Sequence, residues 1–320
     1  MRALALALIF LSSQQAHVLA LSGTRLMAIP EHLWPPPREI ADLPAPITAG
    51  PQEILAWPEE AWRDARFEVF RWDRFPSLLI IDTACYETQD LMLKRIAFYV
   101  EKSGWRGSLA HDEEIADLHG WNAHDYRAGD LASFFQSARD GGFPLGREEI
   151  ELEGLLLDEG LIWETAKGLR GGDGGIISIS RATAHALREL FMAHEGFHSL
   201  YFIDADFRAF TEERWNAFPD EGKTMFLTFL REQNYDADYD FIAQKEFASF
   251  LLQQPAESAG AYFGLRVPQR IESGDWHQAN ESGRDSDGSF PAFAEMFSLE
   301  AQAFCDFVGA LWGFAAGRVW

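Results

Sequence analysis

Three short stretches of the chain have the hydrophobic pattern of β-strands. Two apolar runs of β-favouring residues are separated by Pro76, and a third run alternates isoleucine with serine. A glycine-rich turn comes directly before the third run. The pattern therefore predicts strands at 67–72, 78–81 and 176–180.

Longer segments carry hydrophobic residues at spacings of three and four, which is typical of amphipathic helices. Asp130 and Ser180 stand where helix N-caps are expected, and Pro255 follows the end of another helical segment. The expected helices are 88–101, 130–138, 147–161, 181–201 and 238–254, and the segment 289–317 is expected to form one or two buried helices. Together these elements predict an α+β fold that is predominantly helical and contains a small sheet.

The N-terminal part differs in character from the rest. Residues 1–20 combine an early arginine, a short apolar run and the small residues Val18 and Ala20, which is the pattern of a secretory signal peptide. Residues 21–58 are rich in proline and predict an irregular arm. Residues 59–320 are then expected to form one domain. The signal peptide predicts a secreted or periplasmic location.

Composition and charge narrow the classes of function. The chain has 320 residues, 47% of them hydrophobic, which excludes a mainly disordered protein. Its formal net charge of −23 argues against nucleic acid or an anionic membrane as partner, since both attract clustered Lys and Arg. Cys85 and Cys305 are too few for a disulfide framework or a cysteine zinc site. The sequence is compatible both with one disulfide bridge between these two cysteines and with two buried thiols.

One motif carries specific chemistry. His194 to His198 reads H-E-x-x-H within the predicted helix 181–201. Residues four apart lie one turn above each other on a helix, so both imidazoles can bind one metal ion. Glu195 projects toward the same ion and can take a proton from a water molecule bound there. Zinc suits such nitrogen and oxygen ligands, and a catalytic zinc has three protein ligands.

Two carboxylates are candidates for the third ligand. Glu246 lies 48 residues after His198, on an apolar face of the predicted helix 238–254. A buried carboxylate is costly unless it is paired, and coordination of a metal relieves that cost. Asp204 lies six residues after His198, at a spacing that other zinc motifs use, but Tyr201 replaces the glycine that their turn needs. Glu246 is the preferred ligand, and Asp204 is expected to cap a helix or to orient a histidine.

The motif and the downstream glutamate together resemble the zincin metallopeptidases, specifically the gluzincin branch. The resemblance covers roughly residues 176–254. It implies a zincin-like fold with one zinc ion per chain, held by His194, His198 and Glu246, and with Glu195 as general base. It also implies that the strand at 176–180 is the edge strand along which a peptide substrate aligns.

Other residues have candidate roles that the sequence leaves open. Tyr235, Tyr239, Tyr262 and His277 are the candidate donors to an oxyanion. The segment 120–126 is rich in functional residue types and is interpreted either as a structured loop or as the wall of a substrate pocket.

The most specific expectation is a secreted or periplasmic zinc metallopeptidase whose partner is a peptide or protein substrate. An amidase acting on cell-wall peptides fits equally well. Two alternatives from other classes stay open. One is a catalytically silent zincin-like binding protein, and the other is a helical scaffold in which H-E-x-x-H arose by chance.

Overall fold

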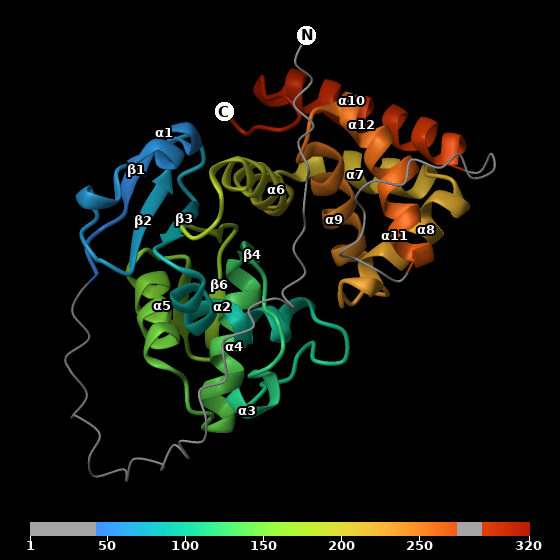
Figure 1. Ribbon diagram of the computed structural model, residues 1–320. Coiled ribbons are helices and arrows are strands. Elements are labelled where there is room, and N and C mark those ends of the chain that lie inside the picture. Colours follow the sequence, from blue (N-terminus) through green and yellow to red (C-terminus); the bar gives the residue numbers. More distant parts are fainter. Residues whose placement is uncertain (1–42, 274–289) are drawn as a thin grey trace, which may run out of the picture.

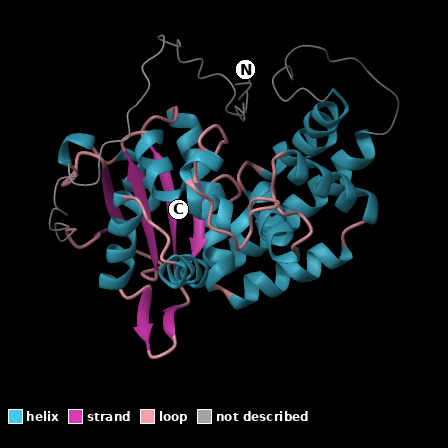
Figure 2. Ribbon diagram, turned by 90° about the horizontal axis from the view of Figure 1, so that it is seen from below, coloured by secondary structure: helices cyan, strands magenta, loops and turns pink. Residues whose placement is uncertain are grey.

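A computed structural model describes residues 43–273 and 290–320 (Figure 1). The expected signal peptide, the first part of the proline-rich arm and His277 lie outside these residues. The described part has a mixed α+β architecture and is mostly helical, as the sequence predicts. Figure 2 shows the strands gathered in one half of the molecule and helices alone in the other.

Five strands form the main sheet of the described part, and their order in space is β1-β2-β3-β7-β4. The pairs β2–β3 and β4–β7 are antiparallel, whereas β1–β2 and β3–β7 are parallel. A separate hairpin joins β5 to β6. The strands are β1 (Ile47–Ala49), β2 (Phe67–Trp72), β3 (Leu78–Thr83), β4 (His124–Arg127), β5 (Ile162–Thr165), β6 (Gly168–Gly171) and β7 (Gly175–Ser180).

Helices cover both faces of this sheet, because successive strand residues point to opposite sides. On one face, Ile81 and Ile176 pack in the hydrophobic cluster that contains residues of α2 (Tyr86–Glu101), α4 (Ala128–Gly141) and α5 (Arg147–Asp158). On the other face, Ile80 and Ile177 pack in the cluster that contains α6 (His185–Ile203). The H-E-x-x-H helix α6 therefore lies between the sheet and the helical half (Figure 1).

A buried ion pair holds α6 on the sheet. Arg188 of α6 donates from both terminal nitrogens to the carboxylate of Asp82 in β3, at 2.8 and 2.9 Å. Arg181 approaches the same carboxylate at 2.8 Å. Two-point pairing of a guanidinium with a carboxylate fixes orientation as well as distance. The pair therefore sets the position from which α6 presents its motif.

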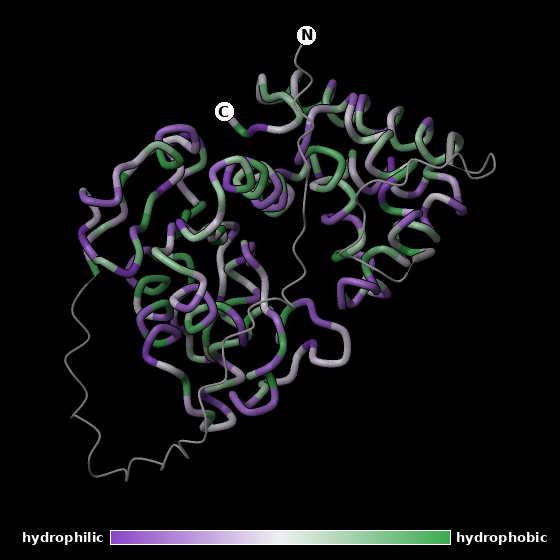
Figure 3. Tube along the Cα trace, in the orientation of Figure 1, coloured by the Kyte–Doolittle hydropathy of each residue, from purple (hydrophilic) through white to green (hydrophobic). Residues whose placement is uncertain are grey.

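The helical half is built around aromatic side chains. Phe226, Phe247, Phe250, Phe263 and Phe297 are all fully buried or nearly so. Figure 3 shows hydrophobic and hydrophilic residues alternating along the helices that enclose them. These helices are α7 (Ala205–Ala217), α8 (Asp220–Glu232), α9 (Asp240–Leu252), α10 (Ala256–Ala261), η3 (Tyr262–Arg266), α11 (Val267–Ser273) and α12 (Phe290–Trp312).

Most predicted elements are confirmed to within a few residues, but several expectations are wrong. The segment 43–58 is not irregular, because it contains the sheet strand β1 and the helix α1 (Pro51–Ala56), and residues of both lie in the core. Two short helices that were not predicted are η2 (Glu59–Ala61) and α3 (Asp112–Ile115). Ser180 does not cap α6, which begins after Ala184. Asp130 caps no helix either, since its carboxylate binds the guanidinium of Arg127.

The expected edge strand is also corrected. The strand β7 lies inside the sheet between β3 and β4, so β4 is the edge strand next to α6.

Cys85 and Cys305 are free thiols, each partly exposed. Among the described helices, none combines the length and the apolar character that a membrane crossing requires.

Candidate metal centre

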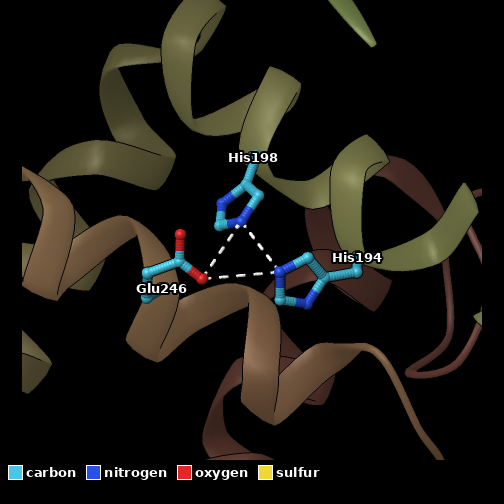
Figure 4. A group of neighbouring side chains, drawn as sticks. All are labelled: His194, His198 and Glu246. Atoms are coloured by element: carbon cyan, nitrogen blue, oxygen red, sulfur yellow. Dashed lines mark hydrogen bonds and ion pairs between the residues drawn. The ribbon is translucent and has the colours of Figure 1, made fainter. Parts of the chain in front are cut away.

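The two motif histidines point toward each other from successive turns of α6. The Nε2 atoms of His194 and His198 are 2.9 Å apart, as the spacing of four residues on a helix predicts. Both side chains are almost completely buried. Figure 4 shows the two imidazoles converging on one point.

Glu246 of α9 completes a triangle of possible ligand atoms. Its Oε2 lies 3.4 Å from Nε2 of His194 and 3.4 Å from Nε2 of His198 (Figure 4). For metal–ligand bonds of about 2.0–2.1 Å in tetrahedral geometry, neighbouring ligand atoms are separated by roughly 3.3 Å. The structure therefore brings together the three residues that the sequence proposes as metal ligands.

The helix α9 also supplies partners for the outer nitrogens of both rings. Nδ1 of His194 lies 3.0 Å from Oε1 of Gln253, and Nδ1 of His198 lies 2.8 Å from Oγ of Ser249. An amide oxygen only accepts, so His194 carries its proton on Nδ1 and turns a lone pair of Nε2 toward the centre. The Ser249 hydroxyl can hold His198 in the same tautomer. Outer partners of this kind orient metal-binding histidines.

The electrostatics of the triangle suit a bound cation. Burial lowers the pKa of His198 to about 3, which keeps its ring neutral. Burial opposes ionisation of Glu246, but its pKa lies well below the usual value, and beside a neutral His198 the charge that favours its carboxylate form is the ammonium group of Lys245. Among the described residues, neither carboxylate oxygen of Glu246 has a hydrogen-bond donor. Two imidazole lone pairs and a buried carboxylate therefore converge where a metal ion would satisfy all three.

Asp204 has a different place in the structure. It follows α6 and caps α7, where its Oδ1 accepts a hydrogen bond of 2.8 Å from the backbone N–H of Phe207. It belongs to none of the described groups of side chains that could hold a metal ion. The expectation that Asp204 caps a helix is thus confirmed.

Glu195 lies close to His198 and Asp125. One oxygen of Glu195, one of Asp125 and a ring nitrogen of His198 lie within 4.8 Å of one another. Burial raises the pKa of Glu195 well above the usual value, and the nearby carboxylate of Asp125 raises it further. A raised pKa makes the carboxylate form of Glu195 a stronger proton acceptor.

Three further charged residues belong to the centre and were missed by the sequence analysis. Asp125 of β4 has its Oδ1 3.7 Å from Nε2 of His198. Lys245 of α9 donates to both oxygens of Asp125 at 2.9 Å and to Glu101 of α2 at 3.2 Å. Two signals were available: Asp125 lies in the segment 120–126, and Lys245 is a charged residue next to Glu246 in a helix of mostly apolar residues.

A pocket of about 160 Å³ reaches this cluster from outside. Asp125 and Lys245 line it next to the centre, so the interpretation of segment 120–126 as a pocket wall agrees with the structure. Tyr239 also lines the pocket, with the guanidinium of Arg106 over its ring at 4.0 Å. Further lining residues come from both halves of the molecule: Tyr99, Val100, Gly107, Arg127, Asp130, Ser133, Phe202, Phe241 and Ile242.

Two of the other candidate oxyanion donors lie apart from the pocket lining. Tyr235 is buried and stacks on Trp121, with ring centroids 4.7 Å apart. Tyr262 is buried in the aromatic core next to Phe263. Of the candidate tyrosines, Tyr239 is therefore the one that a molecule in the pocket would meet.

We expect Ser249→Ala to weaken metal binding by about 10- to 100-fold, because the hydroxyl orients the His198 ring. Competition with a chromogenic chelator measures the affinity. Ser199→Ala is the matched control, since Ser199 is equally buried beside His198 and its hydroxyl has no hydrogen-bond partner among the described residues. Equal affinities in the two variants would show that Ser249 does not orient the ligand.

Comparisons of the chain with protein-family models, with curated proteins and with solved structures find no match, so the centre has to be interpreted from its own geometry.

Proposed function

We propose that this protein is a zinc-dependent peptidase with a gluzincin-like centre. His194, His198 and Glu246 are the proposed zinc ligands, and Glu195 is the proposed general base. The observation that carries the proposal is the triangle of their ligand atoms, with sides of 2.9, 3.4 and 3.4 Å. Its sides are close to the spacing that a tetrahedral zinc ion requires.

The surrounding architecture supports a zincin-like arrangement. The motif helix packs against a sheet whose antiparallel edge strand is β4, and the third ligand comes from a later helix in the other half. Among the described strands, β4 pairs with β7 alone, and we propose that an extended peptide pairs with the other edge of β4. The pocket next to β4 is lined by Asp125 and Lys245, which lie beside His198 and Glu246.

Each residue then has a defined task in hydrolysis. A bound zinc ion would supply Lewis-acid chemistry, lowering the pKa of a water molecule and polarising the scissile carbonyl group. Glu195 takes the proton of the attacking water and later delivers it to the leaving amine. Tyr239, which lines the pocket, is the proposed hydrogen-bond donor to the substrate. The raised pKa of Glu195 supports its proposed role as proton acceptor.

Export from the cytoplasm is part of the proposal. It rests on the signal-peptide pattern of residues 1–20. A secreted or periplasmic peptidase would meet peptide or protein substrates there, including cell-wall peptides.

The first test is the zinc content of the purified protein beside that of His198→Ala. We expect about one zinc ion per chain in the parent and loss of the ion in the variant. The zinc-loaded parent is then assayed against a pool of quenched fluorescent peptides.

The three possible results separate the candidate functions. Zinc with peptide hydrolysis supports the peptidase. Zinc without turnover of any peptide favours a catalytically silent binding protein. No zinc in the parent, even after incubation with the ion, would make the motif a coincidence in a helical scaffold.

A further inference from the structure

Three buried carboxylates meet directly beside the proposed zinc triangle. Oxygen atoms of Glu101, Asp125 and Glu246 lie within 4.8 Å of one another. They come from α2, β4 and α9, so only the tertiary fold brings them together. Grouped carboxylate oxygens are typical ligands of divalent cations, and buried carboxylates without a cation are costly.

The ammonium group of Lys245 occupies the space among these carboxylates. Its Nζ lies 2.9 Å from both oxygens of Asp125, 3.2 Å from Oε2 of Glu101 and 3.5 Å from Oε1 of Glu246. The Lys245 side chain is only 3% exposed. Lys245 therefore donates hydrogen bonds to Asp125 and Glu101 and forms an ion pair with Glu246.

Glu246 belongs to both groups of side chains. Its Oε2 faces the two histidines, and its Oε1 faces Lys245. The two oxygens of one carboxylate can each face a different cation, and here the cation beside Oε1 is the ammonium group of Lys245, which is part of the protein. Because Oε1 of Glu246 faces Lys245, only Oε2 is left to face the two histidines.

We infer that Lys245 takes the place of a second metal ion, so that the centre binds one divalent ion and not two. Lys245 is then a positioning residue, which orients Glu246 toward the histidines and holds Asp125 beside His198. The inference rests on the proposed function for the identity of the first ion as zinc. Beyond the proposed function, Lys245 explains why the centre would bind one ion rather than two.

The test is the metal stoichiometry of Lys245→Met, which keeps the length of the side chain and removes its charge. Equilibrium dialysis against Zn²⁺ is expected to give about one ion per chain for the parent and about two for the variant. With Mn²⁺, electron paramagnetic resonance is expected to change from the signal of an isolated ion to that of a coupled pair. A purely structural role of Lys245 would not produce a coupled pair.

Three further variants serve as controls. Lys245→Arg keeps the positive charge, and we expect it to bind one ion. Lys102→Met removes another buried lysine, whose Nζ lies 3.1 Å above the Trp121 ring rather than among the carboxylates, and it should also bind one ion. Combining Lys245→Met with Glu101→Gln removes one ligand of the second site and should return the stoichiometry to one.

A folded Lys245→Met variant that still binds a single ion would overturn the inference. If this variant folds only with metal, recovery of the native circular dichroism should need two equivalents of the ion. Recovery with one equivalent, or no recovery at any ion concentration, would equally overturn it. A parent that binds no ion would overturn the proposed function, whereas one ion in both the parent and Lys245→Met would overturn the inference alone.

Discussion

Glu195→Gln is expected to lower the rate of peptide hydrolysis by about 10²- to 10⁴-fold and to leave the zinc content unchanged. The amide has the shape of the carboxyl group but cannot accept the proton of the attacking water. Glu195 is not one of the three proposed ligands, so the ion should stay bound. Turnover of a quenched peptide and elemental analysis of the same sample measure both quantities.

Glu189→Gln is the matched control for this prediction. It makes the same substitution on the same helix, at a side chain that is 50% exposed and pairs with His185. We expect parental activity from it. Parental activity from Glu195→Gln as well would remove Glu195 as the general base, while loss of zinc from that variant would give Glu195 a role in binding the ion.

Glu246→Ala is expected to weaken zinc binding by at least about tenfold, because it removes one of three protein ligands. The actual loss should exceed that of Ser249→Ala, which only alters the orientation of a ligand. The substitution also removes the one proposed ligand that α9 contributes. Competition with a chelator of known affinity measures the change.

Asp204→Ala discriminates between the two candidate third ligands. Because Asp204 caps α7, its loss should cost roughly 0.5–2 kcal/mol of unfolding free energy and leave zinc affinity unchanged. Thermal unfolding and the same chelator titration separate these two effects. If Asp204→Ala releases zinc and Glu246→Ala retains it, the assignment of the third ligand is wrong.

The proposed ligands lie on helices from different parts of the fold, and this has a consequence for stability. The pairs His194–Gln253 and His198–Ser249 show that α6 and α9 run antiparallel where they meet. An ion held by both helices would bind the folded chain only, and would therefore stabilise it by mass action. In this proposal, one centre links the sheet half to the helical half.

The sequence alone determined the part of the centre that is local. A helix places residues four apart on the same face, so the H-E-x-x-H spacing is enough to bring His194 and His198 together. The burial of Glu246 followed from its apolar helical neighbours. The three strands and six helical segments that were predicted have regular periodicity over their own length.

The helices α7 and α8 were not predicted, although the sequence of α8 has the hydrophobic spacing of a helix. In α8, Met225, Phe226, Phe229 and Leu230 have helical spacing and are all buried. The helix α7 has a much weaker pattern, because charged residues are spread around most of its surface. Such a helix is stabilised by its neighbours more than by its own periodicity.

Tertiary structure alone decided the remainder of the centre. Glu101, Asp125 and Lys245 are separated by up to 144 residues along the chain and meet only when α2, β4 and α9 pack together. Strand order is equally non-local, which is why β4 and not β7 forms the edge beside α6. Periodicity reports which face of an element is buried, but not which element it is buried against, and that second choice depends on contacts across the whole chain.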